Sequence, residues 1–102
     1  MENFYSKVYE IVKTIPRGRV TTYGTIALKI GDIKYSRAVG YALHCNPEPG
    51  VIPCHRVVNK EGKLSKAFAF GGENVQKRLL EGECVEVDGE NKVDLNKFLM
   101  RG

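Results

Sequence analysis

The N-terminal part of the chain has apolar side chains at every third or fourth position, which is the pattern of amphipathic helices. One such stretch covers residues 4–15 and is stopped by Pro16. A second covers residues 23–30; two threonines before it can cap its first turn, and Gly31 can end it. We therefore predict two short helices, the second ending in a turn near Gly31.

The remainder of the chain alternates between helical and strand-like patterns. Ser36 can cap a third helix, "RAVGYALHCN", which Pro47 stops. The segment "RVVNKEGKL" has apolar residues on both sides of a glycine-containing turn and predicts a hairpin. A further helix is predicted from about residue 73 to 83. The stretch "VEVDGENKVDL" predicts a closing hairpin, and residues 95–99 predict a last short helix.

These elements predict an α/β fold that is mostly helical, namely a winged helix-turn-helix domain with small β-hairpins. At 102 residues the chain is expected to form a single domain over 1–102, without an internal repeat or a flexible linker. Residues 84–102 are expected to add the C-terminal hairpin and the short helix to this domain.

Charge and cysteine usage narrow the class of protein only slightly. Lysine and arginine number 16 against 12 acidic residues, and the net charge of +4 fits a polyanionic partner or simply a basic surface. There is no apolar run long enough to cross a membrane, and the N-terminus lacks the layout of a signal peptide. We expect a monomeric cytoplasmic protein (nuclear in a eukaryote) with no membrane partner, whose three cysteines remain thiols.

The third predicted helix has an unusual outer surface. Arg37 is followed by the small residues Ala38, Gly40 and Ala42, which let a helix backbone come close to another surface. That surface could be a neighbouring helix or the groove of a nucleic acid. A helix that reads the major groove projects several long polar side chains toward base edges, and this helix offers only Arg37. Sequence reading in the major groove is therefore disfavoured.

The segment "GVIPCHRVV" carries the strongest candidate chemistry. Pro53 restricts the backbone beside Cys54, so the thiol has a set direction. His55 and Arg56 follow, and positive charge favours the thiolate, which is the nucleophile that a transfer reaction needs. Inert packing is the alternative, because free cysteines are commonly buried and neighbours on a strand point to opposite faces.

Zinc binding is a competing interpretation, because "HC" at 44–45 is followed by "CH" at 54–55. Structural zinc sites usually place paired ligands roughly two to four residues apart. The chain has no pair with that spacing, so we expect no metal.

Three stretches, "RAVGYAL", "CNPEPGVIPCHRVV" and especially "IPCHRVV", resemble the O6-alkylguanine-DNA alkyltransferases, also called methylated-DNA–protein-cysteine methyltransferases. The resemblance is to their C-terminal active-site domain and covers about residues 4–83. The spacings from Tyr23 to Arg37, Asn46 and Cys54 are similar to those of the family.

The resemblance implies a reaction as well as a fold. Members of this family bind duplex DNA through the minor groove, flip the damaged guanine out of the stack and transfer its O6-alkyl group to a cysteine. It implies that Cys54 is the nucleophile, that His55 takes the thiol proton and that Glu83 orients His55. Asn46 would link the recognition helix to the active-site loop. Tyr23 would crowd the adjacent phosphate and help protonate the leaving base.

The implied partner is double-stranded DNA that contains O6-alkylguanine. The alkylated cysteine would be a stable thioether, so the resemblance implies a single-turnover cysteine S-methyltransferase without a cofactor. Residues of the helix-turn-helix would contact the DNA: Arg37, Tyr23, Thr22, Ser36, Ala38 and Gly40.

The chain departs from the family in two ways. Many relatives carry an additional N-terminal domain, which we do not expect here. The family has a tyrosine in the loop over the base pocket, whereas the loop "SKAFAFGGE" offers only Phe68 and Phe70. We expect one of these rings, together with Val57, to line the pocket. The missing hydroxyl leaves the range of accepted substrates open.

Two other functions compete with transfer. Alkyltransferase-like proteins share the fold, bind the lesion and signal it to other repair proteins without transferring anything. They typically lack the active-site cysteine, so Cys54 favours the methyltransferase. A winged-helix transcription regulator is disfavoured because the predicted recognition helix has few side chains that could read bases.

Overall fold

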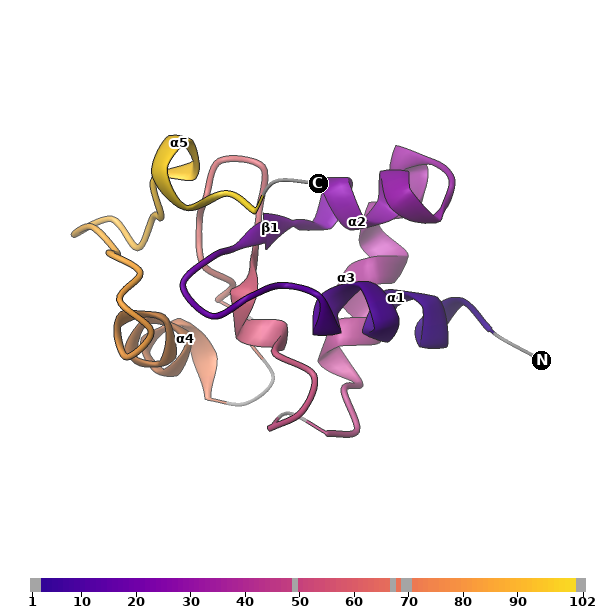
Figure 1. Cartoon of the computed structure of the whole chain (residues 1–102), viewed down its shortest axis with the longest axis horizontal. Coiled ribbons are helices and arrows are strands. Elements are labelled where there is room, and N and C mark those ends of the chain that lie inside the picture. The colour runs from indigo at the N-terminus through magenta and orange to yellow at the C-terminus, as the bar shows by residue number, and fades with distance from the viewer. Residues whose placement is uncertain (1–2, 49, 67, 69–70, 101–102) are drawn as a thin grey trace.

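The computed structural model describes residues 3–48, 50–66, 68 and 71–100. The prediction of a mostly helical domain is confirmed, and its strands are short and parallel (Figure 1). In chain order the elements are α1 (Phe4–Lys13), β1 (Thr21–Thr22), α2 (Tyr23–Ile30), η1 (Ile33–Tyr35), α3 (Ser36–His44), η2 (Cys54–Arg56), β2 (Val57–Val58), α4 (Gly72–Glu81) and α5 (Leu95–Phe98). No helix in the described ranges is long and apolar enough to cross a membrane.

The first two helices begin and end where local signals place them. The side chain of Asn3 caps α1 by accepting a hydrogen bond from the Ser6 amide at 2.8 Å, and the helix ends at Lys13, slightly earlier than predicted. Thr22 caps α2, since its Oγ1 accepts from the Thr25 amide at 3.1 Å. Gly31 ends α2 as predicted.

The start of α3 differs from the prediction. Ser36 is the first residue of the helix and not its cap, because the preceding η1 turn runs directly into α3. Its hydroxyl donates to the carbonyl of Ile33 at 2.7 Å. The turn of the helix-turn-helix therefore contains the short 3-10 helix η1, which lies between α2 and α3.

The first predicted hairpin is only half right. The turn forms, closed by a 3.1 Å hydrogen bond from the Asn59 amide to the Lys63 carbonyl. However, β2 does not pair across this turn. It pairs in parallel with β1, and Lys63 bridges antiparallel to Lys92. Both residues of β2 are buried, and burial on both faces suits an interior parallel strand better than a hairpin with one wet face. The closing hairpin is confirmed by the antiparallel bridge between Val87 and Val93.

Two hydrophobic clusters form the core and meet at the strand pair. The first is built mainly from α1, α2 and α3 and contains Val57. The second contains Val58 and gathers residues from α4, α5 and the C-terminal hairpin. Successive residues of a strand point to opposite faces, so β2 supplies one valine to each cluster. In Figure 1 the three N-terminal helices lie on one side of the strands, and α4 and α5 lie on the other.

Candidate nucleic-acid interface and base pocket

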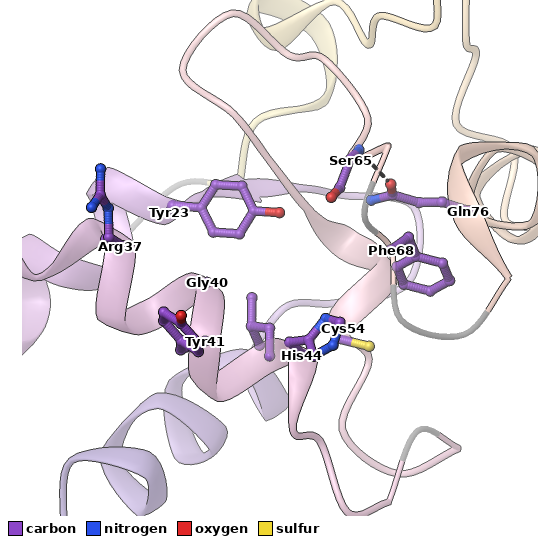
Figure 2. Close-up of a pocket in the computed structure, with 10 residues that line it drawn as sticks. Tyr23, Arg37, Gly40, Tyr41, His44, Cys54, Ser65, Phe68 and Gln76 are labelled. Atoms are coloured by element: carbon purple, nitrogen blue, oxygen red, sulfur yellow. Dashed lines mark hydrogen bonds between the residues drawn. The ribbon is translucent and has the colours of Figure 1, made fainter.

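A cavity of about 370 Å³ opens beside α3, and Tyr23, Arg37 and Cys54 reach it (Figure 2). The other three residues with an implied role, His55, Glu83 and Asn46, are not among its lining residues. The cavity is lined by Tyr23, Arg37, Gly40, Tyr41, Leu43, His44, Cys54, Ser65, Phe68 and Gln76. The start of α2, the length of α3, the η2 turn and the loop before α4 therefore converge on one hollow.

Cys54 lies on the wall of this cavity, and the residue is 6% exposed. Asn46 holds the segment that leads to it: its Nδ2 donates to the Ile52 carbonyl at 2.8 Å, and its Oδ1 accepts from the Glu48 amide at 2.8 Å. These bonds join Asn46, which lies just beyond α3, to the segment before Cys54, and the linking role implied for Asn46 stays a prediction. Burial raises the pKa of Cys54, and a hydrogen bond with Asn46 opposes this without reversing it.

Behind the thiol, one carboxylate joins two neighbouring residues of the signature. Nε2 of His55 lies 3.0 Å from Oε2 of Glu83. Arg56 binds the same carboxylate through both oxygens, with Nε to Oε1 at 2.9 Å and Nη2 to Oε2 at 2.6 Å. Its Nη1 also donates to the Ile15 carbonyl at 2.8 Å. The side chain of Glu83 is only 9% exposed, so this is a largely buried ion pair.

The protonation of this group follows from its surroundings. Burial lowers the pKa of His55, against the opposing hydrogen bond and charge of Glu83. Burial would raise the pKa of Glu83, but hydrogen bonds from Arg56 and His55 hold it below its ordinary value. At neutral pH the histidine is uncharged and the glutamate is ionised. Nε2 therefore carries the hydrogen and donates a hydrogen bond to the carboxylate of Glu83, which leaves Nδ1 of His55 as an acceptor.

Arg56 differs from its predicted role. We expected its charge to favour the thiolate of Cys54. Instead, the guanidinium is engaged by Glu83 and the Ile15 carbonyl, and the pKa of Cys54 is raised. The expectation was wrong because adjacency along the chain does not place a charge beside a thiol.

The residues predicted to line the base pocket differ in where the structure places them. Phe68 lines the cavity and packs against the first cluster, whereas Phe70 lies outside the described residues. Val57 is 1% exposed and belongs to the first cluster, so it forms core and does not line the cavity as predicted. Tyr23 reaches the cavity from the start of α2; burial raises its pKa, and a hydrogen bond with Ser65 partly offsets this.

The small residues of α3 were expected to face either a neighbouring helix or the groove of a nucleic acid, and they differ in their surroundings. Ala42 is fully buried and packs in the first cluster, so close core packing holds at this position. Gly40 lines the cavity, and a Cβ there would meet nothing within 4 Å, so this face is open. Arg37 is exposed and lines the same cavity, while Ala38 is only half-buried and is not among its lining residues.

Two of the expected DNA contacts already have local structural roles. Thr22 is 8% exposed and its hydroxyl lies 2.8 Å from that of Thr25, within the cap of α2. Ser36 bonds to Ile33 at the start of α3. Neither residue lines the cavity.

Sequence reasoning missed Gln76, which joins three parts of the site. This residue of α4 is 1% exposed. Its Oε1 accepts from the Ser65 amide at 2.9 Å, and its Nε2 donates to the carbonyls of His55 at 3.1 Å and Val57 at 3.0 Å. Gln76 gave no signal of its own in the sequence, because its burial depends on backbone groups outside its own helix. Within the described ranges, no three His, Cys, Asp or Glu side chains could together hold a metal ion.

Residues 3–85 match a family model described as "6-O-methylguanine DNA methyltransferase, DNA binding domain". The chain belongs to this family. The family membership predicted from the signature segment is thereby confirmed. The match is to the DNA-binding domain of the family, as the resemblance implied.

Some members of the family match along their whole length. The "Alkyltransferase-like protein 1" of Schizosaccharomyces pombe is 44% identical over 106 aligned positions, which cover 99% of this chain and 97% of that protein. A "DNA base-flipping protein" of Vibrio parahaemolyticus is 38% identical, with 96% of each chain covered. The crystal structure of S. pombe Atl1 in complex with damaged DNA containing O6-carboxymethylguanine superposes with a TM-score of 0.86, at 43% identity and with full coverage of both chains.

These relatives overturn the prediction of a methyltransferase. The methylated-DNA–protein-cysteine methyltransferase of Methanosarcina acetivorans is 45% identical over 82 residues, but these are 79% of this chain and only 52% of that protein. The whole-length matches are to alkyltransferase-like and base-flipping members of the family. The single-turnover enzyme was therefore the wrong choice between the two interpretations. Cys54 misled us because a residue type does not reveal whether its chemistry is used.

Proposed function

We propose that this protein binds duplex DNA containing O6-alkylguanine, extrudes the damaged base into the cavity beside α3, and marks the lesion for other repair proteins without taking its alkyl group. The observation that carries the proposal is that Arg37 on α3, Cys54 and Phe68 line one and the same cavity. The whole-length similarity to a protein crystallised with O6-carboxymethylguanine DNA supports the same ligand class.

The DNA would approach along α3. Gly40 leaves room for close contact with a groove, and Arg37 is an exposed cation one turn earlier on the helix. In the minor groove an inserted side chain can fill the space that an extruded base vacates, and Arg37 is proposed for this role. The net charge of +4 supports a phosphate contribution, so binding should weaken as salt rises.

The extruded guanine would enter between aromatic side chains. Phe68 supplies an apolar ring, and the hydroxyl groups of Tyr23 and Ser65 provide polar contacts near it. A volume of about 370 Å³ falls within the usual range for small-molecule pockets, roughly 300–1,000 Å³. Because the described loop offers an aromatic ring without a hydroxyl at Phe68, stacking rather than hydrogen bonding would dominate on that side.

Retention of the alkyl group on the base fits the state of the thiol. Burial raises the pKa of Cys54, so the reactive thiolate is scarce at neutral pH. The carboxylate of Glu83 accepts hydrogen bonds from both Arg56 and His55. In this proposal the hydrogen-bonded cluster of His55, Arg56 and Glu83 holds the wall of the pocket in place. Residues 84–102 would complete the same domain, because Val85, Val93 and Phe98 belong to the second cluster.

The test uses a duplex with one O6-methylguanine and a matched duplex with guanine. Equilibrium binding is measured by fluorescence anisotropy, and the intact protein is then weighed. We expect tighter binding to the damaged duplex and an unchanged protein mass. Cys54→Ser should keep the preference, since the thiol is not consumed. Equal affinity for the two duplexes, or the gain of a methyl group by the protein, would overturn the proposal.

A further inference from the structure

Tyr41 lies in the middle of α3, on the side that opens to the cavity. Residues four apart on a helix are surface neighbours, so Tyr41 lies one turn beyond Arg37. Figure 2 shows Arg37, Tyr41 and His44 following one another along α3 toward Cys54. All four residues line the cavity, and Tyr41 is exposed to solvent there.

The ring of Tyr41 is unusually exposed. At 64% it is the most exposed large hydrophobic side chain in the part of the chain that the structure describes. Burial of a tyrosine ring is normally favourable, so a ring left in water at the mouth of a pocket suggests a surface that is covered only when a ligand binds.

The other tyrosines already have partners. Tyr5 and Tyr9 lie edge to face, and the Tyr9 hydroxyl donates to the Ala42 carbonyl at 2.7 Å. Tyr35 packs against the ring of Phe4. The side chain of Tyr41, by contrast, has neither a ring contact nor a hydrogen bond among the described residues. Its position is therefore not explained by the fold.

We infer that Tyr41 is a second DNA-reading residue of the site, which stacks on an unstacked base beside the extruded nucleotide. This inference rests on the proposed function, because extrusion of one base exposes the faces of its neighbours. Arg37 would fill the gap in the duplex, and the ring of Tyr41, one turn closer to the pocket, would cover the newly exposed base. The ligand is then the lesion together with a neighbouring nucleotide. Aromatic faces suit this role because every base has a face to stack on.

Tyr41→Ala should weaken binding to the damaged duplex about tenfold, in line with stacking energies of roughly 1–3 kcal/mol per base. Tyr41→Phe should bind like the wild type, because the hydroxyl has no partner to lose. Tyr41→Leu should resemble the alanine variant despite its size. Tyr5→Ala is the matched control on a tyrosine away from the cavity, and its affinity should not change. The exposure of Tyr41 makes all three substitutions compatible with folding.

Two further DNA ligands separate this inference from the proposed function. On the undamaged duplex Tyr41→Ala should change affinity by less than about threefold, since fewer bases are unstacked. On a short single strand, whose bases are unstacked without flipping, the loss should return. A wild type without lesion preference overturns the proposed function, while the loss on single strands still supports stacking. Equal affinities of Tyr41→Ala and wild type on the damaged duplex and the single strand, or full binding by Tyr41→Leu, overturn the role of Tyr41.

Discussion

The segment 53–57 has one side toward the cavity and one toward the interior, and the two sides are built from different kinds of residue. The cavity side presents the Cys54 thiol opposite the exposed or half-buried rings of Tyr41 and Phe68. The inner side is held by the Arg56–Glu83 ion pair and by Gln76, all with hydrogen-bonded side chains. The difference indicates that the inner side supports the segment, while the cavity side is the binding surface that we propose. Substitutions on the two sides should therefore change different measurements.

The largest effect is expected on the inner side, at Arg56. Arg56→Met removes three side-chain hydrogen bonds and leaves the buried Glu83 carboxylate without its cation. Breaking such a pair typically costs about 3–5 kcal/mol, and we expect a loss of that order in the free energy of unfolding, measured by urea denaturation.

Arg17→Met is the control, because Arg17 is exposed and donates a single hydrogen bond to the Gly82 carbonyl. Its effect should stay below about 1 kcal/mol. The protein with Arg56→Met that remains folded should bind the damaged duplex within about threefold of wild type. A large loss of lesion affinity without a loss of stability would contradict the division into two sides.

Gln76 touches both sides, so its substitution should sharpen the comparison. Gln76→Leu keeps the side-chain size but leaves the Ser65 amide and the carbonyls of His55 and Val57 without their partner. We expect the free energy of unfolding to fall by about 2–3 kcal/mol. Lesion affinity should fall as well, because the Ser65 loop loses its attachment. Arg78→Leu, an exposed position on α4, should change stability by less than about 0.5 kcal/mol.

Phe68 tests the cavity side alone. Phe68→Ala should weaken binding to the damaged duplex by about 1–3 kcal/mol, because an extruded base loses its stacking partner. Phe4→Ala is the matched control, since both rings are partly buried against the first cluster but only Phe68 lines the cavity. If the two variants lose lesion affinity equally, the ring of Phe68 is structural.

The smallest effect is a pH dependence of stability from the inner side. The pKa values of both His55 and Glu83 are lower in the folded protein than their ordinary values. The unfolded chain therefore binds more protons at acidic pH, and stability is lost as pH falls. The loss of stability that comes from His55 should begin just below neutrality, and the loss that comes from Glu83 should begin at more acidic pH. Urea denaturation of His55→Gln across this range should lack the first of these losses; an unchanged curve would show that His55 does not contribute.

Features fixed by neighbours in the sequence were predictable. The cap at Thr22 and the stop at Gly31 depend on side chains and backbone within one turn, and both are found as predicted. The pairing of β2 was not predictable in this way, because the valines of "RVVNKEGKL" meet Thr21 and Thr22 and not the residues across their own turn.

The site shows the same division. The signature segment led to Cys54 and His55, and the family resemblance added Glu83; the structure brings His55 and Glu83 into contact. The buried role of Gln76 and the engagement of Arg56 by Glu83 depend on where distant backbone and side chains meet. Whether the thiol reacts depends on its environment, and the sequence could not supply that information.

The two-residue ladder between β1 and β2 also governs how the pocket can arise during folding. Its partners are separated in the sequence by α2, η1, α3 and η2, so the ladder closes a long loop and its formation carries an entropic cost. Contacts of high sequence separation form slowly, whereas the three helices can form from local interactions. We expect pulse-labelled hydrogen exchange to protect α1 and α2 before β2. A synthetic peptide with the whole signature segment would carry the thiol and the imidazole, yet it would have no cavity for a base to enter.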